Sequence, residues 1–166
     1  MTLFQLIKSD YRKHKKYGSH FFAIVFFTQG FWAVFQYRIA HCVYTKVKWK
    51  IFRAPFLFLT LIWQKIIEIT TGISISSSVK IGHSFYIGHF GGIIINANAV
   101  LGDNCNISQG VTIGVSGFED KRGVPVIGNE VYIGGSSSSV LSSKYKSHNE
   151  MENYSECQNR LHYILN

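Results

Sequence analysis

The sequence is poor in cysteine, proline and acidic residues. Its 166 residues include three cysteines, two prolines and nine aspartates or glutamates. Cys42, Cys105 and Cys157 are odd in number and lack the spacing of a metal or redox site, which argues against a disulfide framework. This cysteine usage is typical of a reducing compartment. We therefore expect a cytoplasmic location, with a possible position at the inner membrane surface.

The shortage of acidic residues leaves a net charge of +8. The basic residues gather in Lys8–Lys16 and Lys46–Arg53, and neither cluster lies in a recognisable nucleic-acid-binding motif. Basic side chains beside aromatic ones are more typical of a membrane-surface contact or of a rim that attracts anions. We expect no nucleic-acid partner and no bound metal, and a membrane-surface contact through the N-terminal region is one interpretation of this pattern.

No apolar run of membrane-spanning length is free of polar residues. The segment 21–40 is long enough to span, but it contains two glutamines, a glycine and Arg38. These interruptions favour a buried helix. Neither does the N-terminus show the short apolar core and small-residue cleavage site of a signal peptide.

Residues 1–71 form a predicted helical region. Met1–Tyr17 has an amphipathic pattern, and a second apolar run begins at Ala54, where Pro55 suits a first helical turn. Thr71 and Gly72 supply a stop signal. We expect two or three helices that cap the open end of the following repeat, because a bare end would expose interior side chains and strand edges.

An aliphatic residue returns at six-residue steps within the segment 72–138. The positions are Ile75, Ile81, Ile87, Ile95, Leu101, Ile107, Ile113, Ile127 and Ile133. A period of six fits neither a helix, at about 3.6, nor a strand, at about 2. It fits a solenoid with three flat faces in each coil, whose interior the repeated aliphatic side chains fill. Cys105 lies on a second inward position, which indicates core packing.

The repeat survives two insertions. The step from Ile87 to Ile95 is two residues too long, and the step from Ile113 to Ile127 is eight too long. Insertions in a solenoid become loops at one edge, and such loops often bind ligands. The rhythm stops after residue 138, so residues 139–166 are predicted to be an atypical, irregular tail.

These motifs resemble a known family. The runs GISISSSVKIGHSFYIGHFGGIIINANAVLGDNCNISQGVTIGVSG and GVPVIGNEVYIGG, together with YRIAH (37–41) and EITTGI (68–73), resemble the serine acetyltransferase family of hexapeptide-repeat acyltransferases. They are most similar to the members associated with surface-polysaccharide biosynthesis. The resemblance implies a left-handed parallel β-helix, a homotrimer or a dimer of trimers, and acetyl-coenzyme A (acetyl-CoA) as the donor.

Acetyl transfer to a hydroxyl needs a base, for which imidazole is suited because its pKa lies near working pH. A histidine on a turn is commonly a solvated surface residue. His89, however, lies in the two-residue insertion beside Gly91 and Gly92, where a loop can hold it clear of the coil wall. The resemblance places the family's catalytic histidine at the same position, so we expect His89 to be the general base.

A catalytic imidazole is usually oriented by another group. The resemblance places an aspartate of the serine-specific members at Ser74, and a second histidine of those members at Val124. Both departures fit a sugar hydroxyl better than free serine as the acceptor. The resemblance also assigns Gly91, Gly92 and Gln109 to the acceptor site, although Gln109 fits equally well as an edge amide that satisfies backbone groups.

The donor site is predicted at small residues along the coil edges, where backbone N–H groups can reach the thioester and pantetheine amides. The resemblance places coenzyme A between neighbouring subunits. The candidates are Gly114, Lys121, Gly134, Gly135 and Ser136. A solvated basic loop is the alternative interpretation of Lys121.

Three functional interpretations remain open from the sequence. The first is an active acetyltransferase that uses His89. The second is a family member that folds but is catalytically impaired because it lacks the last coils. The third is a membrane-surface or partner-binding module on the same scaffold.

Overall fold

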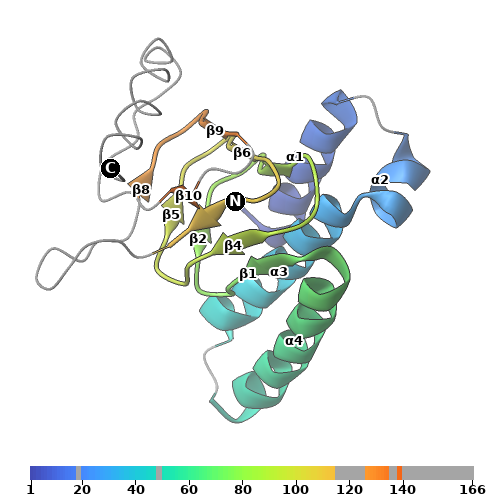
Figure 1. Ribbon diagram of the computed structural model, residues 1–166. Coiled ribbons are helices and arrows are strands. Elements are labelled where there is room, and N and C mark those ends of the chain that lie inside the picture. The colour runs from blue at the N-terminus through green and yellow to red at the C-terminus, as the bar shows by residue number, and fades with distance from the viewer. Residues whose placement is uncertain (18–19, 48–49, 115–125, 135–137, 140–166) are drawn as a thin grey trace, which may run out of the picture.

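The computed structural model describes residues 1–17, 20–47, 50–114, 126–134 and 138–139, with only the backbone of residues 50–53 and 138–139. Within these segments, four helices precede ten short strands, and the helices pack against one end and one side of the stranded part (Figure 1). The helices are α1 (Leu3–Lys16), α2 (Phe21–Phe27), α3 (Gln29–Lys46) and α4 (Lys50–Thr71).

The strands form three parallel sheets, here called A, B and C. Sheet A contains β1 (Ile73–Ile75), β4 (Ile93–Ile95), β7 (Thr112–Ile113) and β10 (Ser138–Ser139). Sheet B contains β2 (Lys80–Ile81), β5 (Val100–Leu101) and β8 (Val126–Ile127). Sheet C contains β3 (Tyr86–Ile87), β6 (Asn106–Ile107) and β9 (Tyr132–Ile133). Successive strands belong to successive sheets, so the chain winds as a three-sided parallel β-helix.

The strand register confirms both predicted insertions. Ile75 pairs with Ile95 across the two-residue insertion, and Leu101 pairs with Ile127 across the eight-residue one. The strands on either side of each insertion therefore stay in register, and the aliphatic positions stay in line. Beyond the last aliphatic position of the repeat, Ser138 and Ser139 pair with Thr112 and Ile113 in sheet A. The ladder uses backbone groups, so this strand needs no aliphatic side chain.

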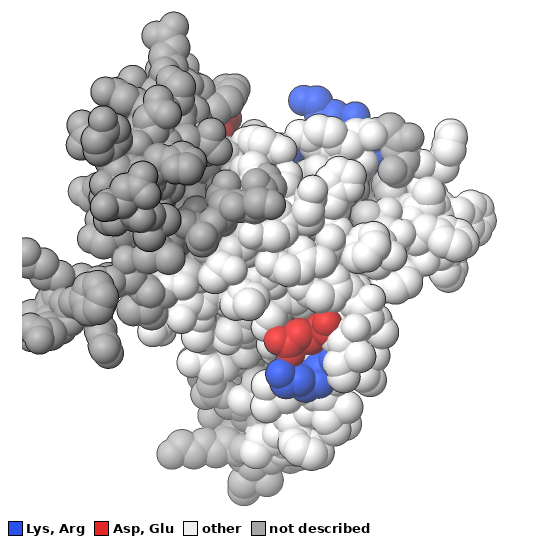
Figure 2. All heavy atoms as spheres, viewed as in Figure 1, with Lys and Arg blue, Asp and Glu red and all other residues white. Residues whose placement is uncertain are grey.

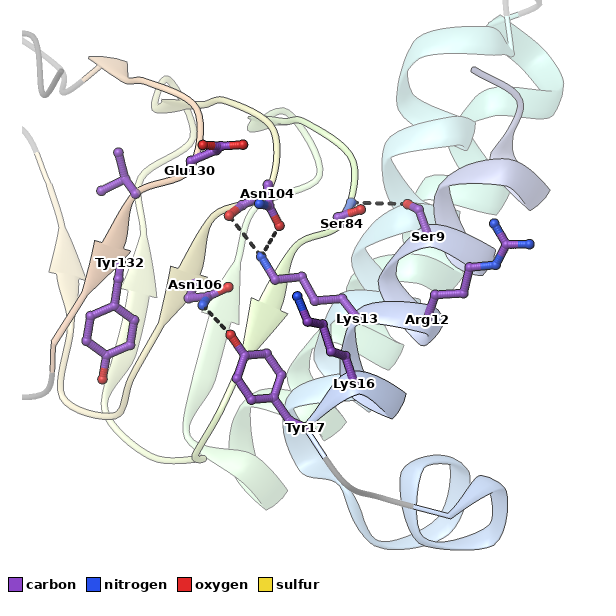
Figure 3. A pocket seen from close by; sticks show the side chains of 11 residues that line it. Ser9, Arg12, Lys13, Lys16, Tyr17, Ser84, Asn104, Asn106, Glu130 and Tyr132 are labelled. Atoms are coloured by element: carbon purple, nitrogen blue, oxygen red, sulfur yellow. Dashed lines mark hydrogen bonds between the residues drawn. The ribbon is translucent and has the colours of Figure 1, made fainter. Parts of the chain in front are cut away.

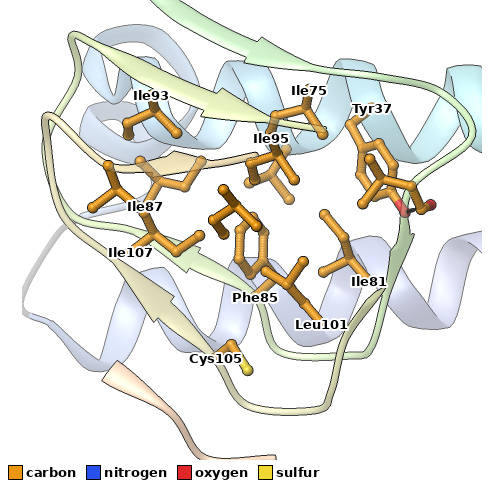
Figure 4. Packing of buried hydrophobic residues seen from close by; sticks show 14 of the residues in the cluster. Tyr37, Ile75, Ile81, Phe85, Ile87, Ile93, Ile95, Leu101, Cys105 and Ile107 are labelled. Carbon is orange, nitrogen blue, oxygen red and sulfur yellow. Dashed lines mark hydrogen bonds between the residues drawn. The ribbon is translucent and has the colours of Figure 1, made fainter. Parts of the chain in front are cut away.

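The core confirms the six-residue pattern. All nine predicted aliphatic residues are buried, as is Cys105. Figure 4 shows those of the first two coils, from Ile75 to Ile107, stacked in the interior. Burial of each such side chain is worth about 1.5–3 kcal/mol. The repeat therefore supplies its own hydrophobic core, and each coil depends on its neighbours to close it.

The N-terminal helices differ in detail from the expectation. The apolar segment 21–40 is divided at Thr28, whose φ of −98° and ψ of 97° are extended. Its hydroxyl donates to the Ala23 carbonyl, and the Trp32 indole N–H donates to the Val25 carbonyl, so polar groups fix the bend. Pro55 lies inside α4, which begins at Lys50, and not in its first turn as predicted.

The surface of the helical region is rich in apolar side chains. The exposed ones include Phe22 and Phe27 on α2 and Phe58 and Ile69 on α4. The face seen in Figure 2 carries few charged groups over these helices. No helix in the described segments has the length and apolar character needed to cross a bilayer. The membrane-surface contact stays a prediction.

Helix α3 covers the open edge of the first coil, as predicted for the helical region. The Tyr37 hydroxyl donates to the Val79 carbonyl at 2.8 Å, and His41 Nδ1 lies 2.8 Å from the Ser77 carbonyl. Tyr37 is fully buried. These contacts satisfy backbone acceptors that no preceding coil can reach, so part of the YRIAH segment has a structural role.

A buried ion pair completes this cap. Arg38 Nε donates to Asp10 Oδ2 at 2.8 Å, and its terminal nitrogens donate to the carbonyls of Ile81 at 2.8 Å and Gly82 at 2.5 Å. The Phe85 amide donates to Asp10 Oδ1 at 2.8 Å. Burial raises the pKa of Asp10, and the hydrogen bonds and charge of Arg38 oppose that rise. One pair thus joins α1, α3 and the first coil.

His14 is a second buried polar residue that the basic pattern of α1 did not predict. Its ring packs against Phe31 and Tyr86, with centroids 5.3 and 4.7 Å apart. Nδ1 lies 2.8 Å from the Asp10 carbonyl, whereas Nε2 has no partner among the described residues. Burial lowers the pKa of His14 to about 4, so the ring is neutral at physiological pH.

The cap can be tested by Arg38→Met. The variant leaves the Asp10 carboxylate buried without its cation, so we expect the free energy of unfolding to fall by about 3–5 kcal/mol. Lys65→Met is the control, because it breaks the exposed Lys65–Glu68 pair, and such pairs are worth about 0–1 kcal/mol. Urea unfolding followed by circular dichroism measures both. Equal losses would contradict the importance of the buried pair.

His14 predicts an acid-sensitive stability. The unfolded chain protonates His14 below about pH 6.5, whereas the folded chain does so only near pH 4. Stability should therefore fall as the pH drops through this window, by up to about 3 kcal/mol. His14→Phe should remove this component, and His20→Gln, at an exposed position, should keep it. The test is to measure the free energy of unfolding from pH 7 to 4 for the wild type and both variants. Identical pH profiles for the three proteins would exclude His14 as the cause.

Candidate functional site

The predicted base lies on the turn between β3 and β4, residues 88–92. His89 and Phe90 are exposed, and 55% of the Phe90 surface is accessible. Gly91 and Gly92 have φ values of +97° and +65°, a region that side chains disfavour. The insertion therefore forms a tight turn at Gly91 and Gly92. The His89 imidazole lies on the outside of the coil.

Glycines from three coils meet at this corner. A Cβ on Gly92 would lie 3.3 Å from Gly110 Cα, and one on Gly72 would lie 3.1 Å from Gly91 Cα. The Gly110 amide donates to the Gly91 carbonyl at 2.9 Å. The backbones are thus too close for side chains. Of the two glycines predicted to lie in the acceptor site, Gly92 has a clear structural role here. A Cβ on Gly91 would meet nothing within 4 Å, so only its φ of +97° favours glycine.

The sheet C register aligns further predicted residues with His89. Ile87, Ile107 and Ile133 are partners across the three coils. His89 follows Ile87 by two positions, and Gln109 follows Ile107 by two positions. Gly134 directly follows Ile133. Gln109 is exposed. The candidate base and the candidate acceptor-site amide therefore occupy the same corner of adjacent coils.

Ser74 lies on the outer face of β1, between two buried isoleucines. The pKa of Glu68 is lowered, first by its hydrogen bond with Lys65 and then by one with the Ser74 hydroxyl. Helix α4 thus brings a carboxylate to the position where the resemblance implied that one was lost. Sequence reasoning missed this role of Glu68, because only the end of α4 against β1 creates it. His89 makes no hydrogen bond within the described residues.

The predicted donor-site residues fall into two groups and an undescribed remainder. Gly134 lies on the corner of His89 and Gln109, whereas Gly114 follows β7 at the other end of sheet A. Among the described residues, and apart from its chain neighbours, a Cβ on Gly114 would come no closer than 3.8 Å to another atom, so packing against them does not require glycine there. Lys121, Gly135 and Ser136 lie outside the described residues. Within one chain, the structure does not bring Gly114 to the His89 corner.

The arrangement has the elements of a proton-transfer site at an open edge. An exposed imidazole can approach a hydroxyl of a bound molecule, and the narrow glycine corner leaves space beside it. Among the described residues, no three histidine, cysteine or acidic side chains are grouped to hold a metal ion. An exposed imidazole such as that of His89 is suited to accept a proton, so this backbone-lined corner is a candidate site for proton transfer.

Comparisons with known proteins agree with this fold. The serine acetyltransferase of Bacillus subtilis (strain 168) is 30% identical over 113 residues, which are 68% of this chain and 48% of the relative. The chain is a homologue of the serine acetyltransferases. No family model matches the sequence.

Solved serine acetyltransferases share the architecture of this homologue. Isoform 3 from Entamoeba histolytica, in complex with cysteine, is 27% identical with a TM-score of 0.66, covering 81% of this chain and 46% of that one. Another, in complex with CoA, is 23% identical with a TM-score of 0.65, covering 81% and 52%. The similarity confirms the left-handed β-helix. The chain spans about half the length of the curated relatives that it matches.

The two kinds of glycine can be separated by mutation. Gly92→Ala should cost about 1–2 kcal/mol of stability, because alanine is strained at positive φ and its Cβ would press on Gly110. Gly114→Ala should change stability by less than about 0.5 kcal/mol, because its surroundings admit a methyl group. Chemical unfolding compares them. A large loss for Gly114→Ala would show that this glycine, too, is structural.

Proposed function

We propose that this protein is an acetyl-CoA-dependent O-acetyltransferase with His89 as the general base. The observation that carries the proposal is the exposed imidazole on the glycine corner of a serine acetyltransferase-like β-helix. The homologues are named for transfer of an acetyl group, and one solved relative of the same fold is in complex with CoA.

In the proposed reaction, the neutral His89 ring takes the proton of the acceptor hydroxyl as its oxygen attacks the thioester carbonyl carbon. The tetrahedral intermediate then collapses, the carbon–sulfur bond breaks, and the proton on the imidazolium passes to the leaving thiolate. The products are the O-acetyl ester and coenzyme A. Backbone N–H groups at the coil edge would bind the oxyanion.

Ser74 enters this proposal as a positioning residue. The Ser74 hydroxyl contributes to the lowered pKa of Glu68, so a negative charge lies near Ser74, although Ser74 itself carries none. The Glu68–Ser74 pair would stabilise an imidazolium on the same side of the molecule. This arrangement replaces the single carboxylate that the resemblance implies for serine-specific relatives.

The donor site requires more than one chain in this proposal. Gly114 and Gly134 lie at opposite ends of sheet A within one chain. A homotrimer would bring the Gly114 corner of one subunit to the Gly134 corner of its neighbour. We therefore propose a homotrimer that binds acetyl-CoA at the subunit seams, with Gly114, Lys121, Gly134, Gly135 and Ser136 as contacts.

The proposed acceptor is a sugar hydroxyl, as in polysaccharide biosynthesis, and serine is the alternative. The departures at Ser74 and Val124 support the sugar. The residues proposed to border the acceptor are Gly91 and Gly92, which lie on the His89 turn, and Gln109, which lies at the same corner of the adjacent coil.

A thiol-release assay with purified protein, acetyl-CoA and candidate serine and sugar acceptors tests the activity. His89→Ala should lower turnover by about 10²–10⁴-fold, as expected for loss of a general base. His83→Ala is the matched control, because His83 is a partly exposed histidine of the same coil whose Nε2 lies 3.4 Å from Asp103. It should retain turnover within about twofold.

Equal activity of wild type and His89→Ala would reject the role of His89. Absence of thiol release with every acceptor would favour the catalytically impaired interpretation. Light scattering on the same sample gives the mass of the assembly, and a monomer with full activity would contradict the proposed seam.

A further inference from the structure

A pocket of about 500 Å³ lies between α1 and the outer face of sheet C (Figure 3). None of the residues predicted for catalysis or donor binding lines it. The lining side chains that matter here are Arg12, Lys13, Lys16, Tyr17, Asn106 and Tyr132.

The pocket exists because α1 covers only the first coil of sheet C. Tyr86, Asn106 and Tyr132 are register partners on the outer face of the three coils. Tyr17 at the end of α1 stacks on Tyr86 with ring centroids 4.3 Å apart. The helix therefore overhangs the next two positions, Asn106 and Tyr132, and leaves a hollow beneath it.

The helix wall of the pocket is positively charged. Arg12 and Lys16 are exposed, whereas Lys13 Nζ donates to the Asn104 carbonyl at 2.8 Å. Burial lowers the pKa of Lys13. Glu130 is the only acidic side chain among the described residues that line the pocket. The hollow therefore favours an anion beside α1.

The opposite wall offers neutral hydrogen-bonding groups. Asn106 Nδ2 donates to the Tyr17 hydroxyl at 2.8 Å, whereas Asn106 Oδ1 is buried and has no partner among the described residues. The Tyr132 hydroxyl lies 2.9 Å from Ser108 Oγ. Amide and phenol groups recognise hydroxyls, and an unmet amide oxygen needs a donor. A carboxylate supplies no such donor and a phosphate monoester supplies at most one, whereas an anionic carbohydrate supplies both charge and several hydroxyls.

The pocket and the His89 turn lie along the same face. Asn106 precedes Gln109 by three residues on the strand that passes under the pocket, a distance of about 10 Å for extended chain. The turn at Ser84 begins the corresponding run of the first coil, which ends at His89. A ligand of more than one sugar unit can therefore occupy the pocket and extend toward the imidazole.

We propose that this pocket binds the charged part of an anionic carbohydrate and thereby presents a hydroxyl of the same molecule to His89. The inference names the acceptor class of the proposed O-acetyl transfer and rests on that function. Arg12 and Lys16 attract the acidic group, and the Asn106 and Tyr132 wall accommodates the sugar ring.

Binding can be measured without acetyl-CoA, by calorimetry on the full chain. The probes are a hyaluronan tetrasaccharide, which carries carboxylates, and chitotetraose, a neutral oligosaccharide of similar size. The acidic probe should bind at least about tenfold more tightly at low salt, and the preference should shrink as salt rises. Equal affinities, or no binding of the acidic probe, would overturn the proposal.

A matched pair of double variants locates the site. Arg12→Gln with Lys16→Gln should weaken the acidic probe by about tenfold, because two solvated contacts of about 0.7 kcal/mol each are lost. Lys8→Gln with Lys15→Gln removes the same charge from exposed positions of α1 outside the pocket. It should leave the affinity within about twofold. Equal losses in both variants would show non-specific attraction to the helix and reject the site.

Two further measurements separate this inference from the proposed function. His89→Ala should bind the acidic probe as wild type does while its thiol release falls by about 10²–10⁴-fold. Binding by wild type without any thiol release would reject the transferase and retain the pocket. Thiol release with neutral acceptors alone would retain the transferase and reject the pocket as its acceptor site. If 3′,5′-ADP displaces the acidic probe, the pocket belongs to the donor and the carbohydrate assignment is wrong.

Discussion

The open edge of the first coil is the constraint on which the rest of the structure depends. A β-helix satisfies each strand from the coils above and below, but its first coil has no predecessor. Arg38 and Tyr37 supply hydrogen bonds to three carbonyls of that coil, and Asp10 holds Arg38 in place while it binds the Phe85 amide. The helical region is therefore part of the solenoid's folding unit.

The solenoid was predictable because its signal is local and repeated. The six-residue spacing of aliphatic residues predicted the inward positions, and the lengths of the insertions predicted the register from one coil to the next. The helices were harder, since propensity shows where a helix can form and tertiary contacts decide where it bends. Thr28 divides an apolar run that looked continuous, and Pro55 is tolerated inside α4. The capping role of Asp10 was hidden in a basic segment, because its partner lies 28 residues away.

The candidate site was predictable only in part, for a physical reason. A turn insertion can be read from the sequence, and it correctly placed His89 on an exposed corner. The approach of Glu68 to Ser74 depends on how α4 meets β1, and the hollow under α1 depends on how far that helix reaches across sheet C. Such juxtapositions leave no periodic mark. Glycines at the corner are ambiguous for the opposite reason, because tight backbone contact and ligand access both require a missing side chain.

The ladder that joins the coils has one further consequence. Strands in register are separated by about 4.8 Å, and this spacing does not vary with the side chains that they carry. Equivalent positions at a corner therefore recur at this spacing from coil to coil, and His89 and Gln109 occupy such positions in adjacent coils. If a functional side chain were placed at position 109 instead of position 89, it would move by one strand spacing, about 4.8 Å, and the buried side chains would not change. Reach toward a ligand can therefore change in fixed steps, independently of stability.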